Sequence, residues 1–88
     1  MLSFEFDRTK SRSNKAKHGI DFEEAQSLWF DERRIEIPAR SSDEDRWIVV
    51  GRIADRVWAA VITYRGGSIR LISARRSRPE EETLYEGR

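Results

Sequence analysis

Residues 57–74 read VWAAVITYRGGSIRLISA, and this stretch decides the fold. β-Branched and aromatic residues fill both of its arms, and Gly66-Gly67 lies between them. A glycine pair suits a two-residue hairpin turn, because the central residues of such turns take positive φ. The turn predicts four cross-strand pairs: Arg65 with Ser68, Tyr64 with Ile69, Thr63 with Arg70 and Ile62 with Leu71.

The same register gives the predicted sheet two unlike faces, because side chains alternate between faces along a strand. One face is predicted to form the core against helices, and it collects Trp58, Ala60, Ile62, Tyr64, Ile69 and Leu71. The opposite face is apolar at one end and basic near the turn, with Val57, Ala59, Val61, Ile72 and Ala74 followed by Thr63, Arg65, Ser68 and Arg70. This second face would suit phosphate groups.

Two helices are predicted in the first third of the chain. Residues 3–7 alternate like a short strand, and Asp7 is placed to cap a basic helix over residues 8–17 that stops before Gly19. Asp21 and Glu24 have the spacing of a capping box at the start of a second helix. That helix is predicted to pack firmly through Phe22, Ala25, Leu28 and Trp29.

Two further strands and a last helix complete the predicted fold. Residues 34–37 form a strand that stops at Pro38, a polar loop follows, and residues 47–53 form a strand that turns at Asp55-Arg56. After Pro79, three glutamates suit the N-terminus of a closing helix. The predicted fold class is α+β, an antiparallel β-sheet packed against two N-terminal helices with a short C-terminal helix. Residues 1–88 are expected to form a single domain.

Charge is unevenly distributed, although the formal net charge is only +1. Residues 46–79 hold eight arginines against Asp55 alone, whereas residues 31–45 and 80–88 are acidic overall. Arginine accounts for 14 of the 17 basic residues, and its planar fork matches phosphate oxygens bidentately. A basic surface attracts polyanions, so nucleic acid is a predicted partner. For any single arginine, a solubilising role on an outward strand position is the alternative.

Composition excludes several classes of site. The chain has no cysteine and one histidine, which excludes disulfides, thiolate metal sites and Cys-His nucleophiles. No apolar run approaches the roughly 18 residues of a membrane helix, and no signal-peptide core is visible. We therefore expect no metal, no cofactor and no membrane contact, in a cytoplasmic protein.

The remaining polar set suits RNA cleavage without a metal ion. In that reaction the ribose 2′-hydroxyl attacks the adjacent phosphodiester, and the enzyme aligns the groups, stabilises the phosphorane and moves two protons. Arginines supply charge stabilisation, and His18 is the first candidate for proton transfer. His18 could instead interact with the end of its own helix. Tyr85 could donate a proton, stack on a base or simply pack the last helix.

Two extended motifs resemble the BrnT family of bacterial type II toxins. The first runs through Asp7, Lys10, Asn14, Lys17-His18-Gly19-Ile20, Phe22 and Glu24-Ala25. The second runs through Arg46, Gly51-Arg52, residues 70–75 (RLISAR), Glu82 and Tyr85-Glu86. Together they cover nearly the whole chain.

The resemblance implies a RelE-like ribonuclease fold and inhibition of translation by RNA cleavage. It also implies a cognate ribbon-helix-helix antitoxin, BrnA-like, which binds DNA, neutralises the toxin and typically assembles a heterotetramer on an antitoxin dimer. The RelE-type pattern of basic residues leaving the last strand, followed by a tyrosine, fits Arg75, Arg76 and Tyr85. Arg52 fits a phosphate-binding arginine of a central strand.

These observations lead to one predicted site and two alternatives. The catalytic candidates are Lys17, His18, Arg52, Arg70, Arg75 and Tyr85, and the RNA-binding candidates are Lys10, Lys15, Arg65 and Arg76. We expect Arg52, Arg70 and Arg75 to meet in one solvent-facing hollow. The alternatives are a non-catalytic module that binds nucleic acid or protein, and a basic surface that mainly receives an acidic helix from a neighbouring protein.

Overall fold

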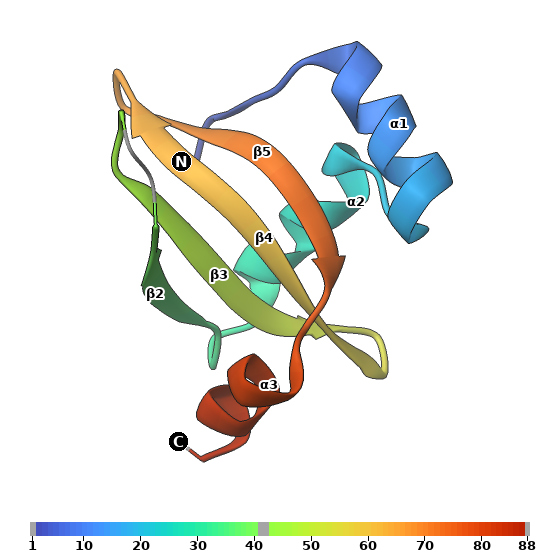
Figure 1. Cartoon of the computed structure of the whole chain (residues 1–88), viewed down its shortest axis with the longest axis vertical. Coiled ribbons are helices and arrows are strands. Elements are labelled where there is room, and N and C mark those ends of the chain that lie inside the picture. The colour runs from blue at the N-terminus through green and yellow to red at the C-terminus, as the bar shows by residue number, and fades with distance from the viewer. Residues whose placement is uncertain (1, 41–42, 88) are drawn as a thin grey trace.

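A five-stranded sheet in the order β1-β5-β4-β3-β2 runs through the molecule (Figure 1). The computed structural model describes residues 2–40 and 43–87. Its strands are β1 (Phe4–Glu5), β2 (Ile35–Ala39), β3 (Arg46–Ile53), β4 (Arg56–Arg65) and β5 (Ser68–Arg76). Its helices are α1 (Arg8–His18), α2 (Phe22–Ala25), the 3₁₀ helix η1 (Gln26–Phe30) and α3 (Pro79–Glu86). The α+β class is confirmed, and the sheet is mixed.

The central hairpin has the predicted turn and register. Gly66 and Gly67 take φ values of 56° and 84°, and all four predicted cross-strand pairs are present. The predicted position of the β3–β4 turn, at Asp55-Arg56, is wrong by one residue. Ile53 pairs with Arg56, so the turn residues are Ala54 and Asp55. Asp55 therefore lies at the second turn position.

A β-bulge at Ile72 changes the faces of the last strand. Ile62 pairs with Leu71, but Val61 pairs with Ser73, so Ile72 has no partner in the ladder. A bulge residue shifts the alternation by one. Ala74 is consequently buried in the helix-side core, and its predicted position on the opposite face is wrong.

The expectation of an antiparallel sheet is wrong at one edge. β1 runs parallel to β5, with Phe4 beside Ile69, and Ile69 N donates to Ser3 O at 2.8 Å. A tight turn forces antiparallel pairing only between strands that are neighbours along the chain. β1 and β5 are separated by most of the sequence, so no turn fixes their direction.

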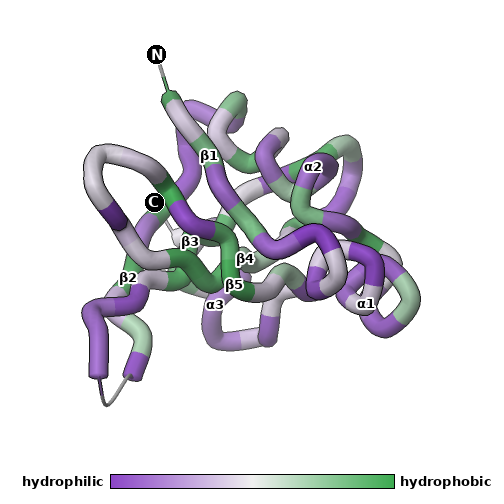
Figure 2. Tube along the Cα trace, turned by 90° about the horizontal axis from the view of Figure 1, so that it is seen from above, coloured by the Kyte–Doolittle hydropathy of each residue, from purple (hydrophilic) through white to green (hydrophobic). Residues whose placement is uncertain are grey.

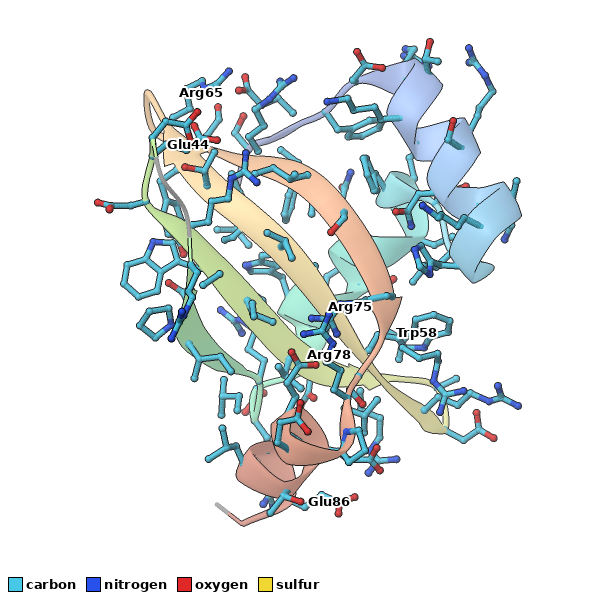
Figure 3. All side chains as sticks on the ribbon, in the orientation of Figure 1. Glu44, Trp58, Arg65, Arg75, Arg78 and Glu86 are labelled. Carbon is cyan, nitrogen blue, oxygen red and sulfur yellow. The ribbon has the colours of Figure 1, made fainter. Side chains whose placement is uncertain are left out.

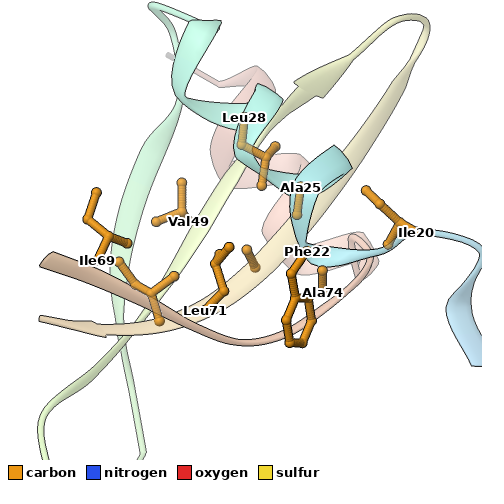
Figure 4. Close-up of a cluster of buried hydrophobic side chains, with 10 residues drawn as sticks. Ile20, Phe22, Ala25, Leu28, Val49, Ile69, Leu71 and Ala74 are labelled. Atoms are coloured by element: carbon orange, nitrogen blue, oxygen red, sulfur yellow. The ribbon is translucent and has the colours of Figure 1, made fainter. Parts of the chain in front are cut away.

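The main core lies between the sheet and the α2–η1 segment (Figure 4). The predicted capping box is present, with Glu24 N donating to Asp21 and Asp21 N donating to Glu24. After Ala25 the helix tightens into η1, so the helical spacing continues as 3₁₀ turns. Phe22, Ala25 and Leu28 are fully buried, which confirms firm packing.

α1 is attached to the sheet mainly through polar groups. In Figure 2 this helix is largely hydrophilic, whereas the strands carry much of the hydrophobic chain. Asp7 caps its first turn, and Gly19 ends it with φ 81°. Ser11 and Asn14 are its buried residues. Ser11 Oγ accepts from Phe22 N at 2.9 Å, which joins α1 to α2.

The other face of the sheet carries α3 over one end (Figure 1). Tyr85 of α3 packs with Val50, Val57 and Ala59 in a second, smaller core. Along the rest of this face, no other element in the described part of the chain lies over the strands. We call this whole side of the sheet, opposite α1 and α2, the open face. Its residues include Arg46, Ile48, Val61, Thr63, Arg65, Arg70, Ile72 and Ser73.

One aromatic residue departs from the predicted core. Tyr64 lies beyond the end of the packed helices and is half exposed. Its hydroxyl donates to Glu36 Oε1 at 2.7 Å, and partial burial together with this bond raises the pKa of Tyr64 to about 12. The predicted burial of Tyr64 is therefore wrong, because the helices end before the turn.

Candidate functional site

Arginines gather at the turn end of the open face. Figure 3 shows Arg65 and Glu44 together at this end, near the β4–β5 turn. Arg46 donates to Glu44 from two nitrogens, each at 3.2 Å, and Arg65 reaches Glu44 at 3.4 Å. Arg70 forms a longer ion pair with Glu5, at 3.6 Å. The three arginines, Glu44 and Lys10 line a hollow of about 240 Å³.

This hollow could hold a phosphate group. Four cationic side chains lie at its wall: Lys10, Arg46, Arg65 and Arg70. The Asp7 carboxylate, also at the wall, accepts a hydrogen bond from Lys10 N and so caps α1. Arginine forks recognise phosphate oxygens by charge-assisted hydrogen bonds. Glu44 holds two of the guanidinium groups in a fixed arrangement, so an incoming phosphate would meet partly ordered donors.

Arg75 lies at the other end of the same face, next to α3 (Figure 3). Its Nη1 and Nη2 donate to the two oxygens of Glu81 at 2.8 and 2.9 Å. The Glu81 hydrogen bond raises the pKa of Arg75. Burial alone would raise the pKa of Glu81, but Arg75 and the backbone N–H of Arg78 outweigh it and lower that pKa. The pair fastens α3 to β5.

Tyr85 is attached to the same end by Asp31. The Tyr85 hydroxyl donates to Asp31 Oδ2 at 2.6 Å, and this bond, with burial, raises the pKa of Tyr85. Asp31 also accepts from the backbone N–H groups of Arg33 and Arg52, at 2.9 and 2.8 Å. Burial would raise the pKa of Asp31, but these three donors outweigh it and lower the pKa. Tyr85 therefore keeps its proton at neutral pH.

Arg52 lies at the rim of this end, on β3. Its guanidinium donates to Asp55 O at 3.4 Å, a long hydrogen bond across the β3–β4 turn. The side chain is exposed and lines a hollow of about 580 Å³ together with Asp31, Arg33 and Tyr85. Of the predicted catalytic arginines it is the most exposed to solvent.

Arg52, Arg70 and Arg75 share one face but do not meet in one hollow, so that expectation is wrong. Arg70 is opposite Thr63, whereas Arg75 is opposite Ala59, further along β4. Arg52 is opposite Val57, further still toward the other end of the sheet. Only the bulge at Ile72 brings Arg75 onto the face of Arg70, because strict alternation would put them on opposite faces.

Four predicted residues lie on the α1 side of the sheet. His18 and Arg76 line a hollow of about 490 Å³, with Arg56 and Trp58 in its wall. The Arg76 guanidinium lies 5.5 Å from the centre of the Trp58 ring, a cation–π contact. Lys15 forms an ion pair with Glu24 at 2.8 Å, and Lys17 is exposed on α1.

The two sides meet at the β3–β4 turn. Ile53 and Ala54 line both the His18 hollow and the Arg52 hollow. A strand of nucleic acid that followed this end of the sheet could therefore touch residues of both groups. The structure nevertheless separates the predicted site into an open-face set and an α1 set.

Three acidic residues of the site were not predicted from the sequence. Glu81 was recognised only as a helix-start residue, and Asp31 and Glu44 were not singled out. All three hold predicted arginines or Tyr85 in place. Their pairing depends on contacts between residues distant in sequence or on loop geometry, for which local spacing gives no signal.

Neither a metal site nor a membrane span is found in the described ranges. Within residues 2–40 and 43–87, no group of three or more His, Asp or Glu side chains is placed to hold a metal ion. No helix there is long and apolar enough to cross a bilayer.

Comparison with known proteins gives one family. The model of the family described as "Ribonuclease toxin, BrnT, of type II toxin-antitoxin system" matches residues 6–81, nearly the whole chain. A search of curated proteins gives no match. The matched range includes Arg52, Arg70 and Arg75, and it ends before Tyr85.

Proposed function

Because the chain belongs to the BrnT family of ribonuclease toxins of type II toxin–antitoxin systems, we propose that it inhibits translation by cleaving RNA on the open face. Toxins of this type act on RNA and have an antitoxin partner. The observation that supports the location is the bulge at Ile72, which puts Arg75 on the same face as Arg52 and Arg70.

The reaction we propose needs no metal ion. The ribose 2′-oxygen attacks the adjacent phosphorus, the bond from phosphorus to the 5′-oxygen breaks, and a 2′,3′-cyclic phosphate remains. The 2′ proton leaves to a base, and the departing 5′-oxygen gains a proton. Arginines on the open face stabilise the additional negative charge of the phosphorane.

Each open-face arginine has a distinct proposed role. Arg70, beside Arg46 and Arg65, anchors a phosphate in the turn-end hollow, and Lys10 adds charge at its wall. Arg52 binds a phosphate at the opposite end, where its guanidinium is exposed. Arg75 lies between them along the face and would engage the reacting phosphate with donors that Glu81 leaves unused.

Proton transfer is assigned to two candidates. Tyr85 holds its proton in a hydrogen bond to Asp31 at 2.6 Å, so its proposed role is that of a proton donor to the leaving oxygen once that bond is released. Stacking of Tyr85 on a base is not supported, because its ring is buried in the second core. The second candidate is the imidazole of His18, which lies at the end of α1 on the other side of the sheet. His18 takes part, with Lys17, Lys15 and Arg76, where RNA continues around the β3–β4 turn onto the α1 side.

We propose that the toxin is neutralised in the way that its resemblance to the BrnT family implies. A cognate ribbon-helix-helix antitoxin, BrnA-like, would bind the toxin in the cytoplasm and contact DNA on behalf of the complex. The proposed assembly is a heterotetramer built on an antitoxin dimer. Light scattering of the purified complex measures its mass and tests this stoichiometry.

Incubation of the purified chain with single-stranded RNA in EDTA tests the proposal. We expect cleavage to continue in EDTA, with cyclic phosphate at the new 3′ ends. Mapping RNA 5′ ends after induced expression, with and without the antitoxin, locates the cuts in cells. Cleavage that appears only after a divalent metal is added back would contradict the mechanism.

A non-catalytic binding module is the second candidate. The observation that favours it is that Arg75 and Tyr85 are already bonded, to Glu81 and Asp31. Binding alone would shift RNA mobility in a salt-dependent way without breaking the strand. A mobility assay at several salt concentrations, read beside a denaturing gel, separates the two candidates.

A further inference from the structure

An apolar hollow opens on the helix side of the sheet, next to an exposed aromatic ring. Phe30, the last residue of η1, is 86% exposed, and Leu2 beside the same hollow is 54% exposed. The rings of Phe4 and Trp29 meet edge to face at 5.0 Å and line the hollow, which measures about 400 Å³. Clustered exposure of large apolar side chains marks an interaction surface.

A second, basic hollow adjoins the first. Ser27 and Phe30 line both, and the second continues over Arg33 and Arg52. The Asp31 carboxylate in its wall already accepts from the Tyr85 hydroxyl and two backbone N–H groups. A carboxylate from another molecule would meet the exposed Arg52 guanidinium there, beside an Asp31 carboxylate whose oxygens already accept three hydrogen bonds.

We propose that these two adjoining hollows are the docking surface for the antitoxin. The occupant is one segment of that protein, with a large apolar side chain packed against Phe30 and Trp29. Acidic residues a few positions away in the same segment reach Arg52. Phe30 lies between the two hollows and is the anchor of the contact.

The side chains that line the apolar hollow favour protein over RNA as the occupant. Leu2 and Phe4 offer apolar surface for a side chain, and Glu23 at the rim repels phosphate groups. An apolar hollow followed by a basic hollow is complementary to a segment in which an apolar residue is followed by acidic residues. Electrostatic complementarity of this kind sets orientation and speeds association.

Docking here would also interfere with RNA. An acidic segment over Arg52 removes one of the phosphate ligands assigned above, so this consequence rests on the proposed function. The binding itself does not rest on it. Affinity for the antitoxin and RNA cleavage can therefore be measured separately, and failure of one leaves the other testable.

Calorimetric titration of the purified chain with its cognate antitoxin tests the proposal. We expect Phe30→Glu and Phe30→Ala to weaken binding at least about tenfold, as for a central interface anchor. The matched control is Leu84→Glu on α3, whose side chain is 53% exposed; its affinity should stay within about twofold of the wild type. Because Phe30 is almost fully exposed, both variants should fold normally, as circular dichroism would check.

Arg52→Glu tests the acidic half of the segment. We expect weaker binding and a smaller loss of affinity on adding salt, since a screened attraction is removed. The proposal is overturned if Phe30→Glu binds the antitoxin like the wild type. It is also overturned if Phe30→Glu only dissolves a dimer of this chain, seen by size-exclusion chromatography, while antitoxin affinity is unchanged.

Discussion

At the residue scale, Asn14 joins three segments through its buried amide. Its Nδ2 donates to Ile20 O and to Ala74 O, both at 2.8 Å, and its Oδ1 accepts from Ala74 N at 3.3 Å. α1 offers almost no apolar surface, so this amide is the main specific link between α1 and β5. Loss of a buried partner leaves backbone groups without a hydrogen bond, which costs more than the bond itself.

Asn14→Ala should lower the free energy of unfolding by about 1–3 kcal/mol, because three backbone groups lose their partner. Urea unfolding followed by Trp fluorescence measures the change. Ser13→Ala, an exposed neighbour on the same helix, is the matched control and should stay within about 0.5 kcal/mol. Equal stability of the two variants would contradict the assigned role of Asn14.

Glu81 should make the free energy of unfolding fall as the pH is lowered into the acid range. Its folded pKa is lowered below its ordinary value of 4.5, so its contribution is present above that pH. The contribution is lost as pH falls from the ordinary value through the folded pKa. Glu81→Gln should destabilise the chain at neutral pH by about 1–2 kcal/mol and flatten the loss of stability below about pH 4.5.

Urea unfolding at a series of pH values, for wild type and Glu81→Gln, checks this prediction. Exposed Glu86 on the same helix supplies a control, since Glu86→Gln should leave the pH profile nearly unchanged. Parallel profiles for wild type and Glu81→Gln would show that the Arg75–Glu81 pair contributes nothing to acid stability.

Sequence could predict residues whose role depends on near neighbours. Asp7 and Gly19 at the ends of α1, and Asp21 with Glu24 at the start of α2, are local signals and are confirmed. Asp31 is different, because its partners Arg52 and Tyr85 are distant in sequence. No spacing rule relates residues brought together only by the folded sheet.

At the element scale, the β3–β4 turn contains a residue other than glycine that takes positive φ. Ala54 has φ 56°, and no other non-glycine residue of the described chain has a positive value. Positive φ at the first of the two turn residues is typical of a type II′ turn, which favours glycine there. Ala54 therefore carries backbone strain at the rim shared by two hollows.

Ala54→Gly should raise the free energy of unfolding by about 0.5–1 kcal/mol, because the relief of strain exceeds the added flexibility of the unfolded chain. Thermal unfolding measures the change as a higher Tm. Ala16→Gly, at an exposed helical position with ordinary φ, should instead destabilise by about 1 kcal/mol. A lower Tm for Ala54→Gly would contradict the assigned strain.

The strands also show where pattern reasoning succeeds and where it stops. Alternation and the Gly66-Gly67 turn predict the β4–β5 register correctly from the turn to Ile62 and Leu71. Beyond that point the bulge at Ile72 reverses the faces, and Ala74 lies in the core. A bulge has no obligatory residue type, so the alternating pattern gives no warning of it.

At the scale of the whole molecule, the sheet separates two basic surfaces. The open face carries Arg46, Arg65 and Arg70 at one end and Arg75 near α3, whereas the α1 side carries His18 and Arg76. The arginine-rich block at residues 46–79 predicts a basic surface but not this division into two. Which side of the sheet an arginine occupies depends on strand register, and the register changes within β5.

Membership of the family does not show where on the molecule RNA is cleaved. The matched residues 6–81 include both basic surfaces. We assign RNA cleavage to the open face, and antitoxin docking to the two hollows that meet at Phe30, which begin on the helix side of the sheet and reach Arg52 at the edge of the open face. Removing one cation from each side of the sheet distinguishes cleavage on the open face from cleavage of a phosphodiester that lies against α1.

The most direct measurement is the rate of cleavage of single-stranded RNA by Arg70→Ala and Arg12→Ala, compared with wild type in EDTA. Arg70 belongs to the open face, and Arg12 is an exposed arginine of α1 that carries no assigned role. We predict that Arg70→Ala lowers kcat/KM at least about tenfold, as for loss of a charge-assisted phosphate contact. Arg12→Ala should stay within about twofold. A larger loss for Arg12→Ala than for Arg70→Ala, in two folded proteins, would contradict cleavage on the open face.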